Sequence, residues 1–308
     1  WIKERTSTSG HHLFNSNVGY DKALFSHATT AESDQAMAVA SDGYTLGSSG
    51  GFNENSQTYV GWNWKANGGT TSSNSDGSIT STVQANTTAG FSIITYTGTG
   101  SNATIGHGLG VTPDWVIVKS RSEAQNWEVL HTSLGAVSNQ DISLNETTGA
   151  QSPNGSVRWN SLPTSSVINL AGGNTTNKSS VTFVAYAFAE IQGYSKFGSY
   201  TGNGSEDGPF VYLGFKPRWI LFKNAGANEE WVLQDTTRNP NNPVTKNIRV
   251  DSNIAEADAS ALDIDFLSNG FKNRSNNAQL NSNGVAYIYM AFAEHPFVSS
   301  EGVPVTAR

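Results

Sequence analysis

Residues Phe183–Glu190 read Phe-Val-Ala-Tyr-Ala-Phe-Ala-Glu, so that a bulky side chain alternates with a small one. The stretch recurs as Tyr287–Glu294, Tyr-Ile-Tyr-Met-Ala-Phe-Ala-Glu, and more loosely as Tyr59–Ala66, Tyr-Val-Gly-Trp-Asn-Trp-Lys-Ala. Alternation with a period of two is strand geometry, because successive side chains of a strand point to opposite faces. We therefore expect three strands, each with its bulky face on a core. The small face predicts something closely packed against it, either a second layer or a neighbouring subunit.

A constant offset of 104 residues relates the last two copies of this strand and the segments that precede them. The matched pairs are Tyr96/Tyr200, Gly110/Gly214, Pro113/Pro217, Trp115/Trp219, Lys119/Lys223 and Trp127/Trp231. One offset that holds without a gap predicts a duplicated domain. With many short strands between Gly, Asn and Ser, the chain is predicted to be all-β. The expected architecture is a series of tandem antiparallel β-sandwich domains, jelly-roll-like and about 100 residues each.

The repeats divide the chain into five segments. Residues 1–66 are a first, incomplete repeat, 67–89 a Gly/Ser/Thr/Asn linker, 90–190 the second repeat, 191–297 the third and 298–308 a C-terminal tail. Small polar residues dominate the linker, which cannot bury enough surface to form a core. Only its two aliphatic positions could hold part of it as an edge strand against a neighbouring domain, and these are Ile79 and Val83.

The first repeat lacks any counterpart of residues 90–116, which include the strand Phe91–Tyr96. Its first residues, Trp1–Arg5, match Ile117–Arg121 instead. A strand that misses a neighbour leaves an open apolar edge. Two explanations stay open: the chain is the C-terminal part of a longer polypeptide, or a partner or another copy supplies the strand.

A turn of the form Gly-x-x-Pro-x-Trp leads into the strands Trp115–Lys119 and Trp219–Lys223. Both strands are apolar on both faces, which indicates central strands covered on either side. Each ends in a lysine, and each Phe-Ala-Glu strand ends in a glutamate, which suggests Lys–Glu pairs across neighbouring strands. Ala66 stands at the glutamate position of the first repeat, so such a pair could not be general.

Composition excludes several classes of protein. The 308 residues carry no cysteine, so neither a disulfide framework nor a thiolate metal site is expected. The formal net charge of −7 argues against a nucleic-acid partner, which would require a basic face. No apolar run approaches the ~18 residues that span a bilayer, so no membrane insertion is expected. A targeting signal ahead of Trp1 stays open.

The sequence offers no repeated catalytic or metal-binding pattern. His107 lies in a glycine-rich turn, but its counterpart in the third repeat is Val211. Asp263 and Asp265 share a strand face, yet their counterparts are Trp159 and Ser161. A calcium site or a glycosidase pair would therefore be private to one repeat. We predict no enzyme activity, no metal and no cofactor.

Tryptophans beside polar residues are the candidate ligand-binding positions. Trp127 and Trp231 follow polar loops and could present a ring face to a sugar, with amides nearby as donors and acceptors. The favoured interpretation of this pair is nevertheless two core residues at the start of a strand. Trp159, flanked by Asn154, Arg158 and Asn160 in a region without a matching repeat, is the better candidate.

Four stretches carry a resemblance to a known family. Asp76–Gly98, Gly106–Gly110, Tyr194–Gly202 and the ending Val298–Arg308 resemble repeats of tail-fibre-like virion structural proteins of marine tailed bacteriophages. The similarity covers nearly the whole chain and carries no assigned site residues.

This resemblance implies a non-enzymatic virion fibre or appendage protein that attaches to saccharides of the host surface. Such a protein would assemble in the host cytoplasm and then act outside it. Its expected partners are other virion subunits, in a homo-oligomer with a trimer favoured, and host glycans. Weak contacts multiplied by symmetry would give tight attachment. The alternatives are a purely architectural virion protein, such as a capsid decoration or tail component, and a polysaccharide-degrading tail spike.

Overall fold

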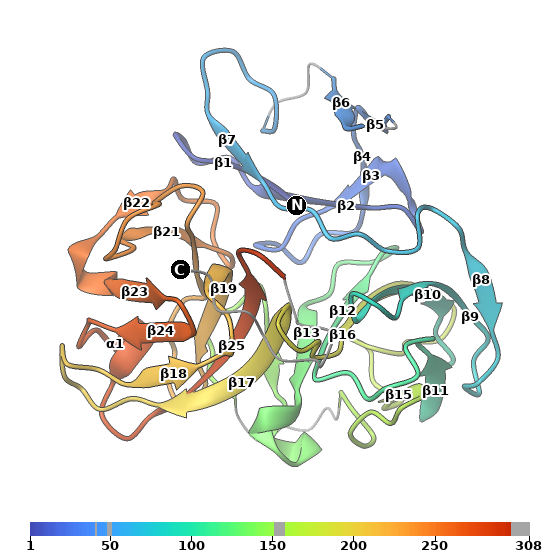
Figure 1. The fold of residues 1–308 in the computed structure, drawn as a ribbon. Coiled ribbons are helices and arrows are strands. Elements are labelled where there is room, and N and C mark those ends of the chain that lie inside the picture. The colour runs from blue at the N-terminus through green and yellow to red at the C-terminus, as the bar shows by residue number, and fades with distance from the viewer. Residues whose placement is uncertain (41, 48–50, 151–157, 297–308) are drawn as a thin grey trace.

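The computed structural model describes residues 1–40, 42–47, 51–150 and 158–296. The chain is almost entirely β, with antiparallel sheets and an all-β sandwich architecture (Figure 1). We name three parts by their residues: the N-terminal unit (1–66), the middle unit (67–190) and the C-terminal unit (191–296). Helical turns are short, namely η1 (Thr132–Leu134), η2 (Val137–Asn139), η3 (Ser260–Leu262) and α1 (Ala278–Asn281).

The N-terminal unit is a five-stranded sheet of order β4-β3-β2-β1-β7. Its strands are β1 (Ile2–Glu4), β2 (His11–Asn15), β3 (Gly19–Leu24), β4 (Ser33–Asp34) and β7 (Tyr59–Gly61). A separate hairpin joins β5 (Met37–Val39) to β6 (Tyr44–Leu46). Among the described residues, β7 therefore has a neighbour on one side only.

The middle unit has a seven-stranded sheet of order β14-β13-β12-β16-β10-β9-β8 and a two-stranded sheet, β11-β15. The larger sheet contains β8 (Ser72–Asn74), β9 (Ser81–Asn86), β10 (Phe91–Thr97), β12 (Trp115–Ser120), β13 (Trp127–His131), β14 (Ile142–Ser143) and β16 (Thr182–Phe188). The smaller one pairs β11 (Ala103–Gly106) with β15 (Val167–Leu170).

The C-terminal unit repeats this plan with a six-stranded sheet of order β17-β25-β19-β20-β21-β22 and a three-stranded sheet of order β18-β24-β23. The first contains β17 (Ser195–Thr201), β19 (Pro217–Asn224), β20 (Val232–Asp235), β21 (Lys246–Arg249), β22 (Ala257–Asp258) and β25 (Ala286–Ala293). The second contains β18 (Phe210–Tyr212), β23 (Ile264–Leu267) and β24 (Gly270–Asn273). The predicted central strands are β12 and β19, and both have neighbours on either side.

The bulky faces of all three sheets enter one common core. Tyr186, Met290 and Trp62 occupy matched positions of the recurring strand and belong to the same buried cluster. The ring of Trp64 lies 5.5 Å from that of Trp219 and 5.6 Å from that of Phe292, so it joins the N-terminal unit to the C-terminal one. Because this apolar surface is shared, the units stabilise one another rather than only themselves.

The small faces pack against a second layer of the same unit, which decides between the two alternatives left by the sequence. Ala185 and Ala187 are fully buried in a cluster with Ile105 and Ile168 of the β11-β15 layer. Ala291 is likewise buried in a cluster with Phe271 of the β18-β24-β23 layer. An alanine face allows these layers to approach closely.

Contacts between the units follow a cyclic pattern. At matched positions a ring nitrogen meets a main-chain oxygen of the adjoining unit: Trp127 Nε1 to Phe25 O (2.8 Å), Trp231 Nε1 to Ser143 O (3.0 Å) and His11 Nε2 to Arg249 O (2.8 Å). Main-chain bonds repeat the pattern: Glu32 N to Arg121 O (2.8 Å), Glu256 N to Arg5 O (2.9 Å) and Ala150 N to Ala225 O (2.8 Å). The three units therefore close into a ring, as Figure 1 shows.

Two of these three junctions carry an additional ion pair. Arg121 binds Glu32 through two N–O contacts of 2.8 and 3.0 Å. Arg5 binds Glu256 in the same way, at 3.0 and 2.9 Å. At the third junction the matched residues are alanines, which cannot form this ion pair, so hydrogen bonds such as Trp231 Nε1 to Ser143 O and Lys223 Nζ to Thr147 O hold it together with packing.

Residues 67–89, expected as a linker, contribute β8 and β9 instead. Strand β9 pairs with β10 from Phe91↔Asn86 to Thr95↔Thr82, so this small polar segment is held by main-chain bonds rather than by a core of its own. Ile79 and Val83 are buried, as the edge-strand alternative expected. Residues 297–308, expected as the end of the third repeat and the tail, lie outside the described residues.

The predicted Lys–Glu pairs are wrong. Because β12 and β16 are antiparallel, Lys119 lies opposite Val184, at the other end of β16 from Glu190. Lys119 Nζ donates instead to the carbonyl oxygens of Thr29 (3.1 Å) and Ser120 (2.7 Å). Its counterpart Lys223 donates to Thr147 O at 2.7 Å. Burial lowers the pKa of each of these lysines to about 8.

Candidate functional site

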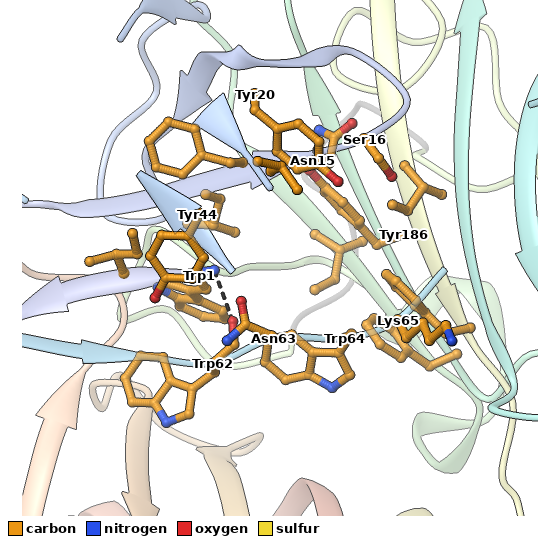
Figure 2. Close-up of a pocket in the computed structure, with 18 of the residues that line it drawn as sticks. Trp1, Asn15, Ser16, Tyr20, Tyr44, Trp62, Asn63, Trp64, Lys65 and Tyr186 are labelled. Carbon is orange, nitrogen blue, oxygen red and sulfur yellow. Dashed lines mark hydrogen bonds between the residues drawn. The ribbon is translucent and has the colours of Figure 1, made fainter. Parts of the chain in front are cut away.

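A cavity of about 640 Å³ lies beside the common core, at the end of the N-terminal sheet where β1 begins and β7 ends (Figure 2). Its walls are mostly apolar and come from all three units. The N-terminal unit supplies the rings of Trp1, Tyr20, Tyr44, Trp62 and Trp64. The middle unit supplies Phe91, Ile93 and Tyr186, and the C-terminal unit Trp219, Leu221 and Met290. We call this cavity the core pocket.

Polar groups at the core pocket are few and mostly engaged. Asn15 Nδ2 donates to the hydroxyl of Tyr186 at 3.0 Å, and Asn15 Oδ1 accepts from the main chain of Val18 at 3.0 Å. Trp62 Nε1 donates to Asp235 Oδ2 at 3.2 Å, away from the cavity. Asn63, Lys65 and Ser16 lie along the cavity in Figure 2. This lining is that of an apolar binding slot.

Matched positions of the other units explain why the cavity exists. Opposite Phe188 the middle sheet places Phe91 on one side and Trp115 on the other. Trp64 holds the position of Phe188 in the N-terminal unit, but no described residue stands on either side of it in the sheet. The core pocket therefore occupies the volume that two large side chains fill in the middle unit.

A second feature, on the outside of the molecule, is an exposed pair of aromatic rings on β18. Phe210 is 47% exposed and Tyr212 60%, and being two residues apart on an edge strand they share a face. Gly270 stands opposite Tyr212 across the strand pair. A Cβ at Gly270 would lie 2.0 Å from the carbonyl oxygen of Val211, so only glycine fits, and the face beside Tyr212 stays flat.

Charged groups border these two rings. Lys272 stands opposite Phe210, and its Nζ lies 2.7 Å from Asp207 Oδ1. That contact holds the pKa of Asp207 below its usual value. On the next strand Asp265 pairs with Arg274 at 3.0 Å. We call the face formed by Phe210, Tyr212, Gly270 and Lys272 the outer aromatic face.

The family profile described as "Domain of unknown function (DUF7483)" matches residues 1–296. The chain belongs to the DUF7483 family. No curated protein matches it, and neither does any solved structure. The DUF7483 match is a single one that spans the core pocket, the outer aromatic face and all three units.

In this DUF7483 chain the tryptophans predicted as candidate sugar-binding residues lie in the interior. Trp127 and Trp231 are fully buried in the common core, and their Nε1 atoms bind main-chain oxygens across the unit junctions. Trp159 is 1% exposed and packs in the core of the middle unit. None of the three rings is exposed on the surface, and Trp127 borders only the internal core pocket, so the geometry favours the packing interpretation.

Arg158, predicted beside Trp159, forms ion pairs with Glu128 and Asp141. Burial raises the pKa of Glu128 to about 7, although the arginine opposes that shift. Arg158 therefore neutralises an internal carboxylate. Asn154 lies outside the described residues. Of the predicted residues, the structure brings Arg158 close to the core but assembles no ligand site around it.

Sequence reasoning missed both features that the structure places together. The rings of the outer aromatic face had a signal: their counterparts in the middle unit are Gly106 and Gly108, so the aromatics are private to one unit. For the core pocket, the only sign in the sequence is the missing strand of the first repeat. The 104-residue spacing of the repeats by itself predicts neither the pair of exposed rings nor the cavity.

The described residues hold no group of three or more His, Cys, Asp or Glu side chains that could bind a metal ion. Of the two weighed carboxylates, Asp265 is engaged with Arg274, and burial raises the pKa of Asp263. In the described part of the chain no helix is long and apolar enough to cross a membrane.

Proposed function

We propose that this chain is a non-enzymatic virion fibre or appendage protein that attaches to saccharides of a host surface. Its place in a virion is supported by the resemblance of four sequence stretches to tail-fibre-like proteins. The attachment is carried by one observation, the outer aromatic face. Exposed rings on a flat strand surface stack on the apolar face of a pyranose, while neighbouring charged side chains bind its hydroxyls.

The energetics fit a weak site that depends on repetition. Two ring stackings of about 1 kcal/mol each, with a few exposed hydrogen bonds, give at most a millimolar to micromolar affinity for one chain. A homo-oligomer, with a trimer favoured, would present several such faces and reach tight attachment through avidity. Other virion subunits would hold the chain in the particle.

A glycan array probed with the intact chain is the test. Binding to at least one saccharide class is expected, and Tyr212→Ala and Phe210→Ala should each weaken it about tenfold. Val111→Ala is the matched control, because Val111 is 49% exposed but distant in sequence from β18. Unchanged binding by both ring variants, or no binding by the intact chain, would refute the attachment role.

A purely architectural role, as a capsid decoration or tail component, is the second candidate. The free edge of β7 beside an apolar pocket favours it, because unpaired strand edges are sites of protein association. A polysaccharide-degrading spike finds no matching observation. Its carboxylate pair would have to include Asp265, which Arg274 neutralises.

A further inference from the structure

We propose that the free edge of β7 and the core pocket together accept an extended strand of a partner polypeptide, with the residue pattern of β10 and β17. This inference does not depend on the attachment role, because that role uses the exposed outer aromatic face of the C-terminal unit. Three independent features of the N-terminal unit carry it: unfilled side-chain volume, an unstacked tyrosine and unpaired main-chain groups.

The side-chain volume is defined by the strands that occupy the same place in the other units. Strand β10 runs antiparallel to β16 and sets Phe91 and Ile93 opposite Phe188 and Tyr186. Strand β17 runs likewise along β25 and sets Phe197 opposite Met290, although Ser195 takes the place of Phe91. The apolar side chains of both strand pairs lie in the common core. The matching places opposite Trp64 and Trp62 are open, and there the core pocket lies.

The aromatic stack is the second feature. Tyr96 stacks on Phe183 with ring centroids 5.2 Å apart, and its hydroxyl donates to Thr176 O at 2.6 Å. Tyr200 stacks on Tyr287 at 5.0 Å and donates to Leu280 O at 2.7 Å. Tyr59 holds the position of Phe183 and Tyr287, but no described ring stacks on it, and its hydroxyl accepts from Glu54 N at 2.8 Å. A strand of the β10 type would bring a tyrosine to it.

The main-chain groups are the third feature. In the middle unit Ala189 N donates to Gly90 O (2.8 Å) and Gly98 N to Val181 O (2.8 Å), so alternation points the odd-numbered residues of β16 toward β10. In the N-terminal unit Trp62 N donates to Trp1 O (2.9 Å), which points the even-numbered residues toward β1. The main-chain groups of Tyr59, Gly61 and Asn63 therefore face the free edge.

The composition of β7 agrees with an outer face that lacks a second layer, where only the Tyr44 hydroxyl comes close, 2.8 Å from a Cβ built at Gly61. Gly61 and Asn63 are exposed, whereas their counterparts Ala185 and Ala187 are fully buried. Strand β10 of a second copy cannot fill the place, because β10 already pairs with β9 and β16 on its two sides. Strand β17 is an edge strand, but its Phe197 is already buried in the common core. The occupant we infer is an extended segment of a partner polypeptide that is free to pair, with aromatic or β-branched residues on alternate positions.

The test uses the intact chain and a synthetic peptide with the sequence of residues 90–98, followed by two lysines for solubility. Binding is measured by calorimetry, and the site by hydrogen–deuterium exchange. By the alternation above, the peptide amides that correspond to Ser92, Ile94 and Tyr96 point toward β7. A peptide N-methylated at those three positions is the probe, and one N-methylated at the positions of Ile93 and Thr95 is the matched control.

We expect the unmodified and control peptides to bind alike, with the probe at least about tenfold weaker, because three main-chain bonds are lost. Exchange at Gly61 should slow when the unmodified peptide is present. Equal binding of probe and control, no binding at all, or displacement by the saccharides found on the glycan array would overturn the proposal. Loss of glycan binding in Tyr212→Ala with peptide binding intact would separate the two sites.

Discussion

In the middle and C-terminal units the strand of the recurring stretch lies between two neighbours, whereas β7 has only β1. The recurring strand is thus paired on both sides in two units and on one side in the N-terminal unit. The outward-facing residues differ accordingly: Ala185 and Ala187 of the fully paired β16 are buried, whereas Gly61 and Asn63 in the N-terminal unit are exposed. The inward-facing positions stay large and apolar in all three, because the common core needs them regardless of the edge.

The largest expected difference concerns the aromatic residue that each copy directs into the common core. Phe188→Ala should cost about 3–5 kcal/mol of unfolding free energy, because Phe188 is 7% exposed and its removal opens a cavity. Trp64→Ala should cost less, about 1–2 kcal/mol, because both rings border the core pocket but Trp64 is only partly buried. Guanidinium unfolding of both variants measures the two values. Equal costs would show that Trp64 is packed as fully as Phe188.

A proline scan compares the two edges directly. Ala185→Pro should destabilise by about 3 kcal/mol, because it removes a main-chain bond to β10 inside a packed sheet. Gly61→Pro removes an N–H that faces the free edge, and should cost about 1 kcal/mol or less. The unfolding free energies of both variants are measured by circular dichroism during chemical denaturation. A severe loss in Gly61→Pro would mean that this N–H is already bonded in the chain.

Stability measured against pH tests a position that differs between the units: it holds Asn15 in the N-terminal unit, His131 in the middle unit and Asp235 in the C-terminal unit. Burial lowers the pKa of His131 to about 4, against 6.5 in the unfolded chain. The folded state therefore binds fewer protons between these values, and stability falls as the pH drops from 6.5 toward 4, by about 2 kcal/mol at pH 5.

His131→Asn, which places the residue of the N-terminal unit at this position, should remove that part of the slope. The difference between the two profiles isolates His131 from other titrating groups, such as Glu128. Parallel profiles over the whole range would show that folding leaves the pKa of His131 unchanged, and would contradict its burial as a neutral ring.

The smallest effects concern the unit junctions. Arg121→Ala should cost about 2 kcal/mol, because it leaves a largely buried Glu32 without its partner. The double variant Arg121→Ala/Glu32→Ala, which copies the alanine junction, should cost about 1 kcal/mol. Installing the pair as Ala225→Arg/Ala150→Glu should change stability by less than about 1 kcal/mol. A double-mutant cycle measures the coupling energy between Arg121 and Glu32. If the costs of the two single variants simply added, the pair would not contribute to stability.

The alternation and the 104-residue offset predicted the fold class and the strands built from Phe183–Glu190 and its copies. They could not show where the bulky faces point, because periodicity states that a face is buried but not whose core buries it. The hydrogen-bond acceptor of Lys119 was not predicted for the same reason, because the acceptor, Thr29 O, belongs to another unit. Residues 67–89 form strands through main-chain bonds, which composition does not record. For the site, the missing strand was visible, but the pocket and the outer aromatic face needed the arrangement of the units.

Native-state hydrogen exchange in increasing guanidinium tests most directly whether the three units form one structure around a common core. Amides of β2, β12 and β19 report the N-terminal, middle and C-terminal units in turn. The common core and the cyclic junctions predict that all three merge into a single global opening with the same free energy. Separate openings, with the N-terminal unit exchanging well below the other two, would contradict the shared core.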